Sequence, residues 1–173
     1  MTKDRGKGQG ARGKIHKESL FPIHGPLTFL YKYIATLGFI GYIPVAPGTF
    51  GTLAGFFLIM LLKPDDMVLL IATLTLFIIG AYTSDHAEKL LGKDSSHIVI
   101  DELCGYFISV LLVPKSVGYL VAAFILFRFF DILKPPPVRN AESSFSGGAG
   151  VMLDDVMAGI YTNICLQAWR YLV

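Results

Sequence analysis

Apolar residues of this chain are grouped in long runs, separated by short segments that contain proline, glycine or charged residues. The runs lie near 27–43, 51–62, 67–83, 98–113, 117–133 and 151–173. They lack the sustained alternation of apolar and polar residues that is typical of half-buried strands, and their length favours helices. Breakers such as Pro44, Pro47 and Pro114 mark where these helices end. The pattern therefore predicts an all-α protein, a compact bundle of about six very apolar helices.

Most of these runs are shorter than the roughly 20 apolar residues that a straight membrane-spanning helix needs. The run at 67–83 contains no charged residue and is the best candidate to span a membrane. Composition points the same way, because the 173 residues are 53% hydrophobic and only 16% charged, with a mean hydropathy of +0.58. Two arrangements stay open: a bundle of membrane helices, some short or tilted, and a compact helical domain that sits on a membrane.

The first 18 residues differ from the rest of the chain. They contain six Lys or Arg residues against Asp4 and Glu18, many glycines and almost no apolar residues. We expect a disordered basic tail at 1–18, followed by one helical domain at 19–173. No apolar segment of a signal peptide follows the tail. Its basic residues favour a cytoplasmic N-terminus, and the tail either contacts anionic lipids or is simply solvated.

Five carboxylates interrupt the apolar runs. They are Asp101, Glu102, Asp131, Asp154 and Asp155. An unpaired buried charge costs several kcal/mol, so these acids need a compensating partner. A divalent cation is the simplest partner for acids in three separate runs, and an all-oxygen ligand set favours Mg²⁺ or Mn²⁺ over zinc. The sequence therefore predicts a metal site that draws on all five.

Two cations accompany one of these acids. Arg128, Asp131 and Lys134 are spaced i, i+3, i+6, and Lys134 directly precedes Pro135, where the helix must end. A simple surface ion pair is one interpretation, but the surrounding phenylalanines are too apolar for a solvated face. An Arg and a Lys beside an acid suit a phosphate that is bridged to a metal.

Glycine-rich turns adjoin the other candidates. The segment 146–150 precedes Asp154 and Asp155, so it either presents amides to an anion or lets one of these acids stabilise the first turn of a helix. Before the second run, Thr49 or Thr52 is a candidate helix cap, and Gly48 and Thr49 are candidate phosphate ligands.

Asp94, the two cysteines and the four histidines are weaker candidates for the site. Asp94 lies two helical turns before Asp101, and capping of a helix over 95–113 is its favoured role. Cys104 and Cys165 lie in apolar runs without CxxC spacing, which predicts small buried hydrophobic residues. The four histidines form no cluster with metal-ligand spacing, and only His97 lies close to a candidate acid in sequence.

Several catalytic motifs are absent from the chain. There is no Cys-x5-Arg loop, because Cys104 is not followed by an arginine at that spacing. No Asp-x-Asp-x-Thr motif, no Gly-x-Ser-x-Gly elbow and no Walker loop occur either. These absences disfavour the corresponding phosphatase, hydrolase and nucleotide-binding classes.

Four stretches resemble the phosphatidylglycerophosphatase A family, and they occur in the family's order. They are GYIPVAPGTFGTLAG at 41–55, IVIDE at 98–102 together with Asp94, FRFFDILKP at 127–135, and GGAGVMLDDVMAG at 147–159. The resemblance covers roughly residues 35–165 and does not include the basic tail. Four ordered motifs are far more specific than any one of them.

The resemblance implies an all-helical, Mg²⁺-dependent phosphatase at the cytoplasmic face of a bacterial inner membrane. Its substrate would be phosphatidylglycerophosphate, hydrolysed to phosphatidylglycerol and inorganic phosphate. The five acids correspond to the family's acidic positions, Arg128 and Lys134 to its basic ones, and Arg139 less clearly so. We expect Glu102 to act as general base, with a covalent aspartyl intermediate as the alternative route.

Two other functions compete with this expectation. A transporter or channel would use intramembrane acids to bind a translocated cation, but here the acids lie beside helix breakers. A purely structural membrane protein would have to satisfy five acids with Arg128, Lys134 and Arg139 alone. We expect a membrane and a lipid phosphate as partners and no nucleic acid; the pattern predicts no particular oligomeric state.

Overall fold

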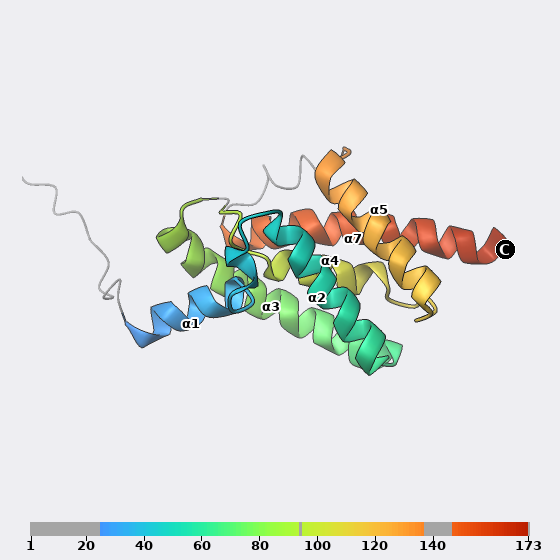
Figure 1. Ribbon diagram of the computed structural model, residues 1–173, viewed down its shortest axis with the longest axis horizontal. Coiled ribbons are helices and arrows are strands. Elements are labelled where there is room, and N and C mark those ends of the chain that lie inside the picture. The colour runs from blue at the N-terminus through green and yellow to red at the C-terminus, as the bar shows by residue number, and fades with distance from the viewer. Residues whose placement is uncertain (1–24, 94, 137–146, 173) are drawn as a thin grey trace, which may run out of the picture.

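The computed structural model describes residues 25–93, 95–136 and 147–172, and every regular element in them is helical (Figure 1). The elements are α1 (Pro26–Ala35), the 3-10 helix η1 (Ile40–Tyr42), α2 (Pro47–Leu62), α3 (Asp66–Leu91), α4 (Ile100–Ser109), α5 (Val117–Leu133) and α7 (Gly148–Leu172). The predicted all-α architecture is confirmed. Among the described residues only α3 and α7 are both long and apolar enough to cross a membrane, so the prediction of six very apolar helices holds only in part. The predicted tail at 1–18 lies outside the described residues.

Helix α4 lies at the centre of the bundle, where it contacts α2, α3, α5 and α7 (Figure 1). Most of its side chains are buried, and the hydroxyl of Tyr106 donates a hydrogen bond to the carbonyl oxygen of Leu120 on α5 (3.0 Å). Ile59 of α2 and Phe127 of α5 belong to the same core. A helix of ten residues is marginal on its own, so its neighbours stabilise it. The acids at its first turn are thus held inside the bundle.

Glycines allow α4 and α7 to pack closely. A Cβ atom at Gly159 would overlap the carbonyl oxygen of Gly105 and lie 3.1 Å from Cβ of Ile108. Small residues at a helix contact let two backbones approach each other. This close approach places the third turn of α7, which carries Asp155, directly beside α4.

The beginning of α4 differs from the prediction. Residues 95–99 are not helical, α4 begins at Ile100, and its N-cap residue is Val99. The amide of Val99 donates a hydrogen bond to the carbonyl oxygen of Ala35 (3.0 Å), which ties this segment to the end of α1. The prediction that Asp94 caps a helix starting near residue 95 is therefore wrong, and Asp94 itself lies outside the described residues.

Two other local predictions are corrected. Helix α7 begins at Gly148, so Asp154 and Asp155 lie in its interior and not in its first turn. Stabilisation of the first turn by these acids is thereby excluded, since the effect of the helix dipole falls off within one turn. Cys104 is buried as predicted. The prediction for Cys165 is wrong, because this residue is exposed in an open groove between α5 and α7.

Two helices, α3 and α7, are long and apolar enough to cross a membrane. Residues 67–84 of α3 carry no charged side chain, and the exposed side chains there include Ile71, Leu74 and Ile78. A helix of this length spans about 27 Å, close to the thickness of a bilayer's hydrocarbon core. At the beginning of α3, the Lys115 ammonium lies 2.7 Å from the Asp66 carboxylate. The uncharged residues 67–84 of α3 thus form an apolar belt between Asp66 at one end and Asp85 at the other.

Candidate active site

The five predicted acids meet at one cavity. It has a volume of about 190 Å³ and lies between the beginning of α4, the end of α5 and the third turn of α7. Its lining residues are Ser95, Ser96, Ile98, Asp101, Glu102, Asp131, Lys134, Val151, Asp154 and Asp155. Acids that are far apart in the sequence therefore form one site.

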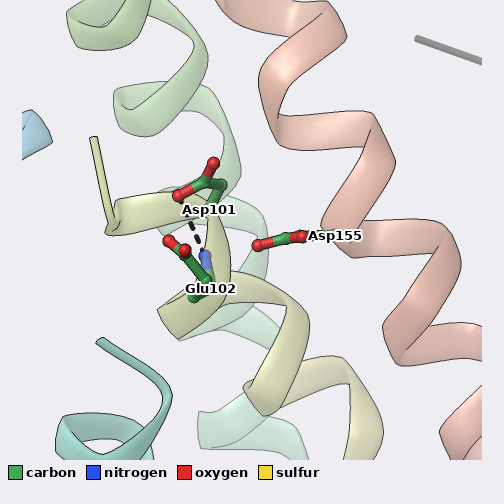
Figure 2. A group of neighbouring side chains, drawn as sticks. All are labelled: Asp101, Glu102 and Asp155. Atoms are coloured by element: carbon green, nitrogen blue, oxygen red, sulfur yellow. Dashed lines mark hydrogen bonds between the residues drawn. The ribbon is translucent and has the colours of Figure 1, made fainter. Parts of the chain in front are cut away.

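Three of the acids form a compact cluster, shown in Figure 2. Asp101 and Glu102 come from the first turn of α4, and Asp155 points toward them from α7. One carboxylate oxygen from each of the three residues lies within 4.8 Å of those from the other two. The backbone amide of Glu102 donates a hydrogen bond to Oδ1 of Asp101 (3.1 Å), which orients that carboxylate. Three carboxylates at this separation repel one another unless a cation or protons compensate them.

Burial makes this repulsion more costly. Asp155 is only 4% exposed. Oε2 of Glu102 and Oδ2 of Asp155 are buried and have no hydrogen-bond partner among the described residues. Burial, followed by the negative charge of Asp101, raises the pKa of Glu102 well above its usual range, and burial also raises the pKa of Asp101. An all-oxygen cluster with unsatisfied buried oxygens fits a hard divalent cation such as Mg²⁺.

The other two acids are paired with cations. On α5, Arg128 and Asp131 share a helix face as their i, i+3 spacing predicted, and Nη1 of Arg128 lies 2.7 Å from Oδ2 of Asp131. The ammonium of Lys134 pairs with the carboxylate of Asp154 on α7. Lys134 is the C-cap residue of α5 and adopts a left-handed conformation (φ 45°), so the helix ends where Pro135 predicted. The five acids thus divide into a cluster of three and two ion pairs.

The first turn of α2 lies against this site. A Cβ atom at Gly48 would overlap Oε1 of Glu102 and would lie 3.3 Å from Nη1 of Arg128. The N-cap residue of α2 is Ala46, without a side-chain cap, and Thr52 donates its hydroxyl hydrogen bond to the carbonyl oxygen of Gly48 (3.0 Å). The predicted capping by Thr49 or Thr52 is therefore wrong. Gly48 lies behind the site, Thr49 does not line the cavity, and their contacts with phosphate stay predictions.

Sequence reasoning missed two polar residues of the cavity wall, Ser95 and Ser96. Their only signal was a pair of hydroxyls just before the motif that carries Asp101. His97, by contrast, does not line the cavity. Its Nδ1 lies 2.7 Å from the carbonyl oxygen of Gly41, and its ring stacks on Tyr42, so it joins the loop before α4 to η1. Arg139 lies outside the described residues.

Sequence comparisons relate the chain to known proteins. Residues 33–170 match the family described as Phosphatidylglycerophosphatase A. The chain is 42% identical over 135 residues to a Haemophilus influenzae protein named phosphatidylglycerophosphatase A, covering 76% of this chain and 83% of that one. It is 36% identical over 124 residues to the protein of the same name from Escherichia coli, covering 69% and 72%.

A third relative carries a different name. The chain is 39% identical over 155 residues to a putative phosphatidylinositol-3-phosphatase of Bacteroides thetaiotaomicron, covering 84% of this chain and 97% of that one. No solved structure matches the chain.

Proposed function

This chain belongs to the phosphatidylglycerophosphatase A family, and from that premise we propose that it is a Mg²⁺-dependent phosphatase of phosphatidylglycerophosphate. The products are phosphatidylglycerol and inorganic phosphate. The observation that carries the proposal is the cluster of Asp101, Glu102 and Asp155 beside the cations Arg128 and Lys134. Carboxylates that can hold a metal next to two cations suit the hydrolysis of a phosphomonoester dianion.

We assign the metal to the three-carboxylate cluster, with Asp101 and Asp155 as its main ligands. A divalent cation bound there would neutralise phosphoryl charge and lower the pKa of a water molecule. Asp131 and Asp154 lie at the same cavity, but each already has a cationic partner. Their proposed role is to hold Arg128 and Lys134 in place.

Arg128 and Lys134 are the proposed phosphate ligands. The guanidinium of Arg128 presents a planar fork that matches two phosphate oxygens, whereas Lys134 supplies a compact charge. Arg128 lies one turn before the last turn of α5 and Lys134 is its C-cap residue, so one helix end positions both. Stabilising the charge that develops on the phosphoryl oxygens is the main contribution expected from such groups.

Glu102 is the proposed general base. Its pKa is raised by burial, which is the usual way to bring a carboxylate toward the pH at which it accepts a proton. It would take one proton from the attacking water while the water oxygen bonds to phosphorus and the bond between phosphorus and the lipid oxygen breaks. The leaving alkoxide would then take up that proton from Glu102, directly or through water. A phosphoryl-aspartate intermediate is the alternative and requires an acid in line with the leaving oxygen.

The proposed location is a bacterial inner membrane with the site on the cytoplasmic side. Helix α1 packs on the C-terminal half of α3, where Tyr31 contacts Tyr82 and His86. It is also bonded to the segment before α4, so the chain enters the bundle on the side of the active site. Six basic residues precede this entry, and basic residues next to membrane helices favour the cytoplasm.

Phosphate release by the purified protein in detergent tests the proposal. The substrates are phosphatidylglycerophosphate, phosphatidylinositol 3-phosphate, phosphatidic acid and a soluble glycerol phosphate, each with Mg²⁺ or with EDTA. The inositol lipid is included because one relative bears that name. We expect release from phosphatidylglycerophosphate that needs Mg²⁺ and is lost in Asp131→Asn and Asp154→Asn.

Full activity in EDTA would contradict the metal dependence, and preference for another lipid would contradict the substrate. Cation flux in proteoliposomes without hydrolysis would favour a transporter.

A further inference from the structure

A second cavity lies between α5 and α7, away from the acids. It is a groove with a volume of about 600 Å³. Its lining residues are Ser116, Gly118, Tyr119, Ala122, Leu126, Cys165, Leu166 and Trp169. None of them is charged, so the groove offers neither a metal site nor an anion site. Its chemistry suits a hydrocarbon.

The groove and the active site share their two walls. On α5, Leu126 lies five residues before Asp131, about 7.5 Å along the helix axis. On α7, Cys165 lies ten residues beyond Asp155, about 15 Å along the axis. Since the end of α5 pairs with Asp154 and its beginning lies near Trp169, the two helices run in opposite directions. The groove therefore lies farther along the same two helices than the site, toward the beginning of α5 and the end of α7.

The surface around the groove is also apolar. Val121, Ile125 and Ile164 are exposed beside it, at 43%, 61% and 57% of their surface. Trp169 and Arg170 lie near the far end of the groove, close to the C-terminus of α7. Trp and basic residues are typical of the membrane–water interface. Exposed apolar side chains therefore flank the mouth of the groove.

We propose that the groove between α5 and α7 binds an acyl chain of the phospholipid whose phosphate is hydrolysed. This inference rests on the proposed function, which supplies a substrate with its phosphate at the acids and its chains in the bilayer. The acyl chains of a membrane lipid are already out of water, so moving one into the groove brings little hydrophobic free energy. The effect of the groove is to orient the headgroup, because a chain seated between α5 and α7 restricts where the phosphate can lie.

Ala122→Phe tests the groove, because Ala122 lines it and a phenyl ring would fill it. For a substrate with long oleoyl chains we expect kcat/KM to fall about tenfold, the effect of lost orientation. For dihexanoyl phosphatidylglycerophosphate, whose chains are too short to fill the groove, we expect kcat/KM to change by less than about twofold. Val121→Phe is the matched control, since Val121 is exposed on the same helix but does not line the groove. Equal loss on both substrates, or no loss on either, overturns the proposal.

Trp169 provides a readout that does not need catalysis. It is the only tryptophan of the chain and lines the groove. In detergent micelles, phosphatidylglycerophosphate with brominated chains should quench its fluorescence at low mole fraction. The unbrominated substrate should reverse the quenching, and phosphatidylcholine with the same chains should not. Quenching that both lipids reverse equally means that the groove takes any lipid, and it overturns the proposal.

The two readouts separate the groove from the proposed function. If the wild-type protein does not hydrolyse phosphatidylglycerophosphate, the proposed function fails, and the specific quenching of Trp169 still decides whether this lipid occupies the groove. If hydrolysis occurs but Ala122→Phe leaves both kinetics and quenching unchanged, only the groove is refuted.

Discussion

Gly48 lies so close to Glu102 that a methyl group at position 48 would overlap the carboxylate oxygen Oε1. The first turn of α2 therefore forms a wall behind the acid that we assign as general base. A side chain at this position has to displace either Glu102 or the neighbouring guanidinium of Arg128, whose Nη1 would lie 3.3 Å from the added atom.

Gly48→Ala is accordingly expected to abolish most activity while the protein still folds. Alanine is favoured over glycine in a helix, so α2 itself should tolerate the change. Displacing a catalytic carboxylate by about 1 Å can cost on the order of 100-fold in rate. Phosphate release and thermal unfolding measure the two effects, with Leu58→Ala on the exposed side of α2 as control. Normal activity in Gly48→Ala would show that Glu102 is not held at this wall.

Lys134 and Asp154 should behave as one unit, because their ion pair joins α5 to α7. Lys134→Met and Asp154→Asn are each expected to lower kcat/KM at least about tenfold, and the double variant should be little worse than either single one. A double-mutant cycle on phosphate release measures the coupling. Losses that simply multiply would mean that the two side chains act independently.

The three clustered acids should differ in their response to Mg²⁺. Asp101→Asn and Asp155→Asn remove proposed ligands, so the Mg²⁺ concentration for half-maximal activity should rise by about 10-fold or more. Glu102→Gln removes the proposed base and should lower kcat by about 100-fold or more with a smaller change in the Mg²⁺ requirement. Titrations of activity with Mg²⁺ for the three variants make the distinction. A larger shift of the Mg²⁺ requirement in Glu102→Gln than in the two aspartate variants would identify Glu102 as a main ligand.

The folded protein without metal should lose stability as the pH rises, and Mg²⁺ should restore that stability. Burial raises the pKa values of Asp101 and Glu102, so the metal-free folded protein holds protons that the unfolded chain releases near pH 4 (about 3.9 for Asp and 4.3 for Glu). Its stability therefore falls as the pH rises above this value. Binding of Mg²⁺ needs ionised carboxylates, so the increase of Tm on adding Mg²⁺ should be larger at about pH 8 than at about pH 5.5.

Glu102→Gln supplies the control for this pH effect. It removes one buried charge, so the metal-free variant should melt a few degrees higher than the wild type at about pH 8. An increase of Tm by Mg²⁺ that is the same at both pH values would contradict a metal site built from these acids.

The apolar belt can be tested on α3. Leu74 is exposed in the middle of the uncharged segment 67–84, so Leu74→Arg would place a charge in the hydrocarbon core. Arginine at the centre of a membrane helix costs about 2.5–3.5 kcal/mol, and less of the variant should be retained in membranes after an alkaline wash. Leu62→Arg, next to Lys63 at the end of α2, is expected to be retained like the wild type. Equal retention of the two variants would mean that α3 does not cross the membrane.

Much of the fold could be predicted from the order of residues, because helix formation and its breakers depend on neighbours in the chain. The uncharged run at 67–83 predicted the greater part of helix α3, and Pro135 predicted the residue at which α5 ends. The beginning of α4 could not be predicted, since Val99 is held by the carbonyl oxygen of Ala35 from a distant helix. The exposure of Cys165 could not be predicted either, because an apolar run alone does not reveal which side faces the bundle.

The order of residues specifies which chemical groups this protein brings to its site: five acids in apolar runs, with Arg128 and Lys134 beside one of them. How these groups pair depends on the packing of the helices. Close packing of α4 on α7 at Gly159 brings Asp155 to Asp101 and Glu102, and the crossing of α5 over α7 gives Lys134 the partner Asp154. Spacing along one helix determines which residues share a face of that helix. Contacts between helices depend on backbone approach and crossing, which no local pattern specifies.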